Sequence, residues 1–148
     1  MEAGRTVERA RLVAPCGTDC GICELHVCQE DAALRERLIA RGVRPEKLPC
    51  PGCREIKGAC PVIGAVCETW ACSTTHGVES CHLCTDFPCT RLAPAADRAN
   101  VLPHNMKVYN LCVVAHRGVG ALVQESAGLR QRYYQGRMEI GKGPQLSP

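Results

Sequence analysis

The sequence predicts a small, α-rich and irregular domain stabilised by metal, in which several short helices surround metal-binding loops. Cysteine accounts for 13 of the 148 residues, and all but one of these cysteines lie between Cys16 and Cys89. Leucine, isoleucine, valine and phenylalanine make up only about a fifth of the chain, close to the level where a conventional core becomes hard to build. Helical periodicity is confined to short stretches. Because the free energy of metal binding is also folding free energy, coordinated metal can supply the missing stability.

The length of 148 residues is typical of a single domain, which we divide into four consecutive parts. Residues 1–15 are predicted to be an extended or partly helical lead-in to a Cys-rich metal-binding core at residues 16–93. Residues 94–135 are predicted to be the helical C-terminal part of the same domain. Residues 136–148 are rich in glycine and proline, which predicts a tail that is flexible or ordered only against a partner.

Apolar residues at helical spacing predict three longer helices, over residues 29–41, 105–117 and 120–135. A glycine follows each of the first two, and glycine is a common helix stop. The apolar residues within 62–66 predict a further short helix that delivers Cys67 to its site. These helices are expected to form a casing around the cysteine-bearing loops.

The formal net charge of +3 treats every cysteine as neutral. A divalent ion or a doubly charged cubane held by four thiolates carries about −2 overall, so three such sites would move the net charge to roughly −3. The basic run at residues 35–47 has no aromatic stacking platform beside it and is interpreted as a solvated helix face. The composition therefore predicts no nucleic-acid partner.

The first 15 residues lack the apolar region of a signal peptide, and no apolar run approaches the length of a membrane span. These features predict a cytoplasmic protein without a membrane span. Thiols stay reduced in that compartment, and the odd number of cysteines also argues against a closed disulfide framework.

Cysteines spaced two to four residues apart can converge on one metal centre, because a short loop bends back close to its start. Such turns occur at residues 16–23, 50–53 and 81–84, and the cysteines within one turn are predicted to share a site. Fourth ligands are expected to come from distant segments. The predicted metal ligands are Cys16, Cys20, Cys23, Cys28, Cys50, Cys53, Cys60, Cys67, Cys72, Cys81, Cys84 and Cys89.

Zinc and iron–sulfur clusters both use such ligands. Structural zinc favours paired Cys-x-x-Cys turns, which residues 50–53 and 81–84 supply. Cubane clusters favour three closely spaced cysteines plus a distant one, as at residues 16–23 and 81–89, with Pro88 beside the last cysteine. Nearly pure thiolate ligation favours two or more [4Fe-4S] clusters, and Zn²⁺ is the alternative.

Several linked motifs extend across the core: Cys16-Gly17-x-x-Cys20-x-x-Cys23, Cys50-x-Gly52-Cys53, Cys67-x4-Cys72, Gly77-Val78-x-x-Cys81-x-x-Cys84 and Phe87-Pro88-Cys89. Together they resemble an uncharacterised bacterial and archaeal Cys-rich family of unknown function, commonly suggested to bind zinc. The resemblance covers roughly residues 16–125 and implies metal binding without implying an activity. Cys28, Cys60 and Cys112 depart from the usual pattern of that family.

Catalytic residues are sparse. No Ser–His–Asp or paired-carboxylate pattern stands out, so the chain is not expected to be a catalyst on its own. Residues 16–23 match the spacing of radical S-adenosylmethionine enzymes, but the chain lacks the length and strand pattern of their barrel. His26, His76 and His82 could replace a cysteine at a metal, although polar loop roles are favoured. Cys112, within a predicted helix, is interpreted as a small buried hydrophobe.

The leading functional hypothesis is an iron–sulfur protein in electron transfer, or a small accessory subunit of a larger anaerobic enzyme complex. Its partner would be a redox protein or the host enzyme complex. The alternative is a zinc-binding structural or interaction module with no redox role. A third possibility is a thiol-based metal carrier or redox sensor with one labile site.

Overall fold

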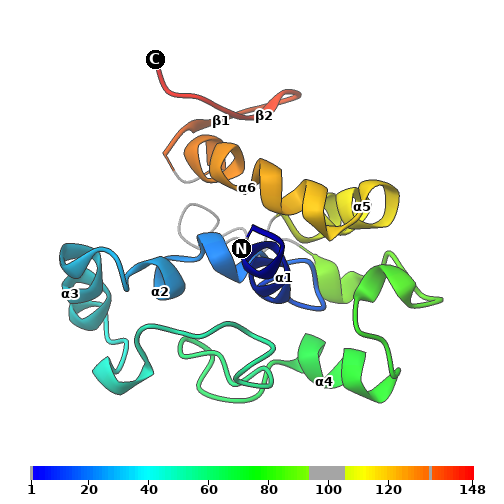
Figure 1. Ribbon diagram of the computed structural model, residues 1–148, viewed down its shortest axis with the longest axis horizontal. Helices are drawn as coiled ribbons and strands as arrows, with labels where there is room; N and C mark the ends of the chain where they lie inside the picture. Colours follow the sequence, from blue (N-terminus) through cyan, green and yellow to red (C-terminus); the bar gives the residue numbers. More distant parts are fainter. Residues whose placement is uncertain (1, 94–105, 134) are drawn as a thin grey trace.

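The computed structural model describes residues 2–93, 106–133 and 135–148, and its helices are short and joined by long loops (Figure 1). The α-helices in this part of the chain are α1 (Glu2–Arg11), α2 (Glu24–Val27), α3 (Ala32–Ala40), α4 (Glu68–Thr75), α5 (Lys107–Arg117) and α6 (Val119–Tyr133). Single 3-10 turns are η1 (Cys20–Ile22), η2 (Pro45–Lys47), η3 (Cys81–Leu83) and η4 (Thr90–Leu92). The prediction of a small α-rich domain with several short helices is confirmed.

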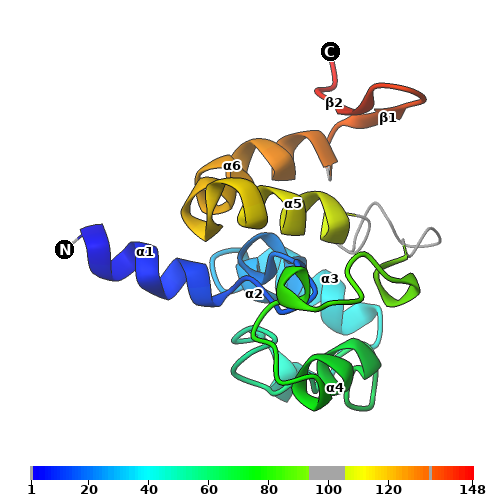
Figure 2. The same cartoon turned by 90° about the vertical axis from the view of Figure 1, so that its right-hand side faces the viewer.

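The elements lie in three levels, and both views agree on their order (Figures 1 and 2). The α5–α6 pair lies on one side of α1 and the first cysteine loop (residues 16–23), while α4 and the loops around it lie on the other side. Helix α6 packs against α1, and η3 packs against α5. The first cysteine loop is therefore sandwiched between the helical pair and the other cysteine-bearing segments.

A short hairpin follows α6 within the predicted tail. Strand β1 (Arg137–Glu139) pairs antiparallel with β2 (Gly143–Gln145), and both strands pack against α6. The predicted boundary at residue 94 and the predicted helix start at Asn105 fall in 94–105, outside the described residues. In the parts of the chain that are described, no helix combines the length and apolar character needed to cross a membrane.

The three longer predicted helices correspond to α3, α5 and α6. Helix α3 begins where the Asp31 side chain accepts a hydrogen bond from the Leu34 amide at 2.9 Å, a normal N-cap. The predicted helix within 62–66 is wrong, because those residues form turns and bends. Gly64 there has a φ of +71°, a conformation that interrupts a right-handed helix. Helix α4 begins only after Cys67, so this cysteine caps the start of a helix instead of following one.

Two hydrophobic clusters flank the centre of the molecule. One is built around Leu25, Leu34 and Leu38, and the other around Val13 and Leu122. Each is small, in agreement with the low content of large aliphatic residues.

Cys112 is exposed, which corrects its predicted burial. The inward side of α5 carries Lys107, Asn110 and Leu111. Their spacing of three to four residues follows one face of a helix, and position 112 lies about 100° away from Leu111 around the axis.

A buried ion pair joins α1, the first cysteine loop and α6. Both oxygens of Asp19, which is 0 % exposed, accept hydrogen bonds from the Arg9 guanidinium at 2.7 Å. The Gly21 amide donates to the same carboxylate at 2.9 Å, and so does the Ser126 hydroxyl. A bidentate, fully hydrogen-bonded carboxylate of this kind holds its loop in one orientation. The loop that carries Cys20 is therefore positioned by polar contacts as well as by any metal.

Candidate metal centres

Seven of the predicted ligand cysteines line one central cavity of about 80 Å³, here called the seven-cysteine cavity. They come from three segments that are distant in sequence, residues 16–23, 50–53 and 60–67. Apolar side chains such as Leu25 and Ile56 complete much of the wall. The cysteines concerned are Cys16, Cys20, Cys23, Cys50, Cys53, Cys60 and Cys67.

Glycine allows the first cysteine loop to approach α5 closely. Gly17 has a φ of +84°, and a side chain there would clash with the Lys107 carbonyl oxygen and the Leu111 side chain. The Asn110 side-chain amide donates to the Gly17 carbonyl at 2.7 Å. This contact holds the turn between Cys16 and Cys20 against α5. Glycine suits such a tight turn because it adopts a positive φ without steric cost.

Backbone amides point at several sulfurs of the cavity. The Cys53 amide lies 3.4 Å from Cys20 Sγ and donates to it. Burial raises the pKa of three further thiols, and backbone hydrogen bonds partly offset this rise. These bonds come from Leu25 to Cys23, from Gly52 to Cys50, and from Val62 and Ile63 to Cys60. Amide hydrogen bonds of this kind stabilise negative charge on sulfur and tune the potentials of bound clusters.

Burial raises the pKa of five thiols of this cavity: Cys20, Cys23, Cys50, Cys53 and Cys60. It raises the pKa of Cys23 to about 12, where nearby Cys50 and Cys60 add to the effect. Burial also raises the pKa of Cys53 to about 12, and the neighbouring Cys16 and Cys67 make smaller contributions in the same direction. A metal ligand must be a thiolate, so an incoming cation has to displace these protons.

A buried lysine lines the same cavity. Lys107 is only 8 % exposed, and none of the carboxylates in the described residues forms an ion pair with it. A positive charge in the cavity wall attracts negative charge, and a metal–thiolate centre of net negative charge in the cavity would supply it.

The wall of the seven-cysteine cavity also borders an open groove. This groove, of about 730 Å³, shares His26 and Cys50 with the cavity. The His26 Nδ1–H donates to the Cys50 carbonyl at 2.8 Å. Charged side chains including Arg11, Arg54 and Glu55 line the groove, so solvent and charged molecules can approach this wall.

Four more predicted ligands line a second, smaller cavity of about 30 Å³: Cys72, Cys81, Cys84 and Cys89. We call it the four-cysteine cavity. Cys89 is exposed and the other three are half-buried. The Cys81 amide donates to the Pro15 carbonyl at 2.8 Å, which ties this cavity to the first cysteine loop. Burial raises the pKa of Cys81 to about 11, and the charge of nearby Cys16 makes the next largest contribution to this rise.

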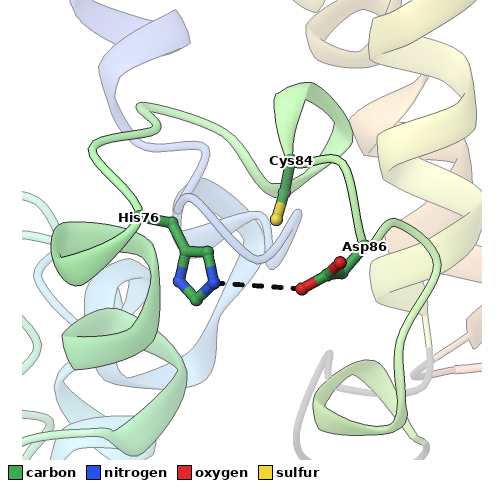
Figure 3. A group of neighbouring side chains, drawn as sticks. All are labelled: His76, Cys84 and Asp86. Carbon is green, nitrogen blue, oxygen red and sulfur yellow. Dashed lines mark ion pairs between the residues drawn. The ribbon is translucent and has the colours of Figure 1, made fainter.

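At the edge of the four-cysteine cavity, His76, Cys84 and Asp86 lie together (Figure 3). Their ligand atoms are all within 4.8 Å of one another. His76 caps the C-terminus of α4, and Cys84 follows η3. From sequence, a polar loop role was favoured for His76, and the structure instead brings it beside Cys84 and Asp86. The only local signal was His76 four residues after Cys72, a spacing that puts both on one side of a helix.

Cys28 lines neither cavity. It is 1 % exposed within the hydrophobic cluster of Leu25 and Leu34, and its thiol donates to the Leu25 carbonyl at 3.4 Å. The structure thus gathers eleven of the twelve predicted ligands into two cavities. All 13 cysteines lie in the described ranges, and each of them is a free thiol.

The fold and the two cavities define a small, α-rich, cysteine-rich domain whose cysteine side chains are grouped in two places. Residues 12–94 match the family described as "Protein of unknown function (DUF3795)", and the chain belongs to that family. This confirms the resemblance to an uncharacterised family. The matched segment contains every cysteine of both cavities. No curated protein and no solved structure matches the chain significantly.

Proposed function

We propose that this protein is an iron–sulfur protein that holds [4Fe-4S] clusters between its cysteine loops. It acts in electron transfer, or as a small accessory subunit of a larger anaerobic enzyme complex. The observation that carries this proposal is the convergence of seven thiols from three segments on one buried, largely apolar cavity. Soft thiolate donors select zinc or iron–sulfur clusters and disfavour hard cations such as Mg²⁺ or Ca²⁺.

The number of thiols favours clusters over a single zinc ion. Seven thiols line the cavity, more than the four ligands that one tetrahedral zinc ion takes. A cubane takes three closely spaced cysteines plus a distant one, and residues 16–23 carry three closely spaced cysteines in one loop.

The residues around the cavity fit a negatively charged centre. When bound, a [4Fe-4S] cluster supplies one-electron redox chemistry. The amides directed at Cys20, Cys23 and Cys50 stabilise charge on their sulfurs, and Lys107 adds a positive charge in the cavity wall. Both effects favour the more negative, reduced state, while the apolar wall limits access of water.

The charged groove is the expected approach for a redox partner. It meets the cavity at His26 and Cys50, so a protein seated there would come close to the buried centre. Arginine and glutamate side chains along the groove suit the brief, electrostatically steered contacts that redox partners make.

Anaerobic purification of the full chain tests the proposal. We expect a brown protein with broad visible absorption and matching amounts of iron and sulfide. The variant Cys20→Ser should lose much of this iron, whereas Cys112→Ser, which changes an exposed cysteine outside both cavities, should keep it. A colourless chain containing about two or three zinc ions would contradict the proposal and favour a zinc-binding structural module. A chain that binds neither metal would contradict both.

A further inference from the structure

We propose that His76, Cys84 and Asp86 form an outer metal site that takes a borderline divalent cation such as Zn²⁺. The site lies at the mouth of the four-cysteine cavity and leaves one coordination position open to solvent. This inference does not rest on iron–sulfur clusters in the seven-cysteine cavity. It follows from the positions of three side chains that no sequence motif links.

The three side chains converge from different segments (Figure 3). The imidazole extends from the end of α4, the carboxylate extends from the turn after η3, and the sulfur points into the space between them. His76 Nε2 and Asp86 Oδ2 are 3.9 Å apart, and Cys84 Sγ lies within 4.8 Å of both ligand atoms. One ion can contact a nitrogen, a sulfur and an oxygen at this spacing.

The hydrogen bonding of His76 orients it as a metal ligand. Its Nδ1 lies 2.9 Å from the Cys72 carbonyl oxygen, and a carbonyl only accepts, so Nδ1 carries the hydrogen. In the neutral ring, Nε2 then presents a lone pair toward Asp86. Metal-binding histidines commonly donate their other ring N–H to a backbone carbonyl in this way.

The distance between His76 and Asp86 also favours an intervening cation. At 3.9 Å, Nε2 and Oδ2 are too far apart for a direct hydrogen bond. A lone pair and a carboxylate that face each other across such a gap are stabilised by a positive ion between them. The competing explanation is a doubly protonated His76 that forms a loose, exposed ion pair with Asp86, and the test below separates the two.

The donor set and its exposure indicate which ion fits. Zinc binds nitrogen, sulfur and oxygen ligands, and exchangeable or catalytic zinc sites have three protein ligands plus water. The side chains of His76 and Asp86 are 44 % and 71 % exposed, so water can fill the fourth position. On binding, the cation replaces the thiol proton of Cys84, and that proton leaves to solvent.

Titration of the full chain with Co²⁺ tests this site, after dialysis against a chelator to remove loosely held ions. We expect one equivalent of Co²⁺ with a thiolate-to-cobalt charge-transfer band. His76→Ala and Asp86→Asn should each weaken this binding by at least about tenfold, the effect of losing a supporting group or more.

Two matched controls come from the same region. His82→Ala removes a histidine whose Nδ1 is bonded to Ser80 Oγ, and Glu79→Gln removes an exposed acidic charge outside the site. Both should bind Co²⁺ like the unaltered chain. Absence of a thiolate band in the unaltered chain overturns the proposal. Loss of Co²⁺ in Cys72→Ser and Cys89→Ser, with His76→Ala unaffected, also overturns it by placing the ion in the four-cysteine cavity. Iron and sulfide contents measured on the same samples test the cluster proposal independently of Co²⁺ binding.

Discussion

The two cysteine cavities use the same residue type in opposite environments. The seven-cysteine cavity lies at the centre, with backbone amides directed at its sulfurs and a buried lysine in its wall. The four-cysteine cavity reaches the surface, where Cys89 is exposed and a histidine and a carboxylate stand at its mouth. Burial and neighbouring charge, and not cysteine number, therefore distinguish the two cavities. Under the two proposals, the seven-cysteine cavity holds a permanent centre and the mouth of the four-cysteine cavity holds an exchangeable ion.

The largest contrast should appear when each cavity loses a cysteine. Cys53→Ser removes the thiol next to both Cys16 and Cys67, so we expect loss of bound metal together with loss of cooperative folding. Free energies of about 10 kcal/mol accompany structural metal binding in small domains, more than most domains can lose. Cys84→Ser should lose the exchangeable ion at the mouth of the four-cysteine cavity only and keep a cooperative thermal transition. Equal melting curves and equal metal loss in the two variants would remove the distinction between the cavities.

The next largest effect concerns the buried ion pair that positions the first cysteine loop. Asp19→Ala leaves the Arg9 guanidinium without its partner, and breaking a buried pair costs about 3–5 kcal/mol. Urea unfolding of the metal-loaded chain measures this loss. Glu24→Ala is the matched control, because the half-exposed pair of Glu24 and Arg41 is 3.7 Å long and is worth about 1 kcal/mol or less. Similar unfolding free energies for the two variants would show that the loop does not depend on Asp19.

The metal-free and metal-loaded chains should respond to pH in opposite directions. In the metal-free fold, burial raises the pKa of Cys23 from 9.0 to about 12, so the unfolded state loses its proton first as pH rises. Stability should therefore fall between pH 9 and 12, by up to about 1.4 kcal/mol per pH unit for this thiol. In the loaded chain the ligands are thiolates, and stability should instead fall with acid as protons displace the metal. Denaturant midpoints across pH check both slopes, and parallel slopes would contradict metal ligation by Cys23.

The smallest expected effect comes from the buried lysine. Lys107→Met removes a positive charge from the wall of the seven-cysteine cavity, which should make the reduction potential of a bound cluster more negative by tens of millivolts, on the order of other local charge effects. Protein-film voltammetry measures the shift. Lys142→Met, at an exposed lysine paired with Glu139 in the hairpin, should leave the potential unchanged. An unchanged potential in both variants would mean that Lys107 does not face the centre.

Local patterns predicted the parts of the fold that depend on near neighbours. The helices α3, α5 and α6 follow from apolar spacing and from stop signals such as Gly42 and Gly118. The helix expected within 62–66 was wrong because a short apolar run carries little periodicity, and Gly64 with its positive φ interrupts it. The burial expected for Cys112 was wrong because packing against α6 and the first loop selects another face of α5.

Ligand spacing and helical periodicity are properties of nearby residues, so the chain's cysteine-rich, α-rich character could be predicted from sequence. Tertiary packing fixes how the cysteines divide, since the segments 16–23, 50–53 and 60–67 must converge from distant positions. It also decided that Asp19 anchors a loop and that His76 faces Asp86. Such contacts depend on how whole segments pack, and no local spacing in the chain encodes them.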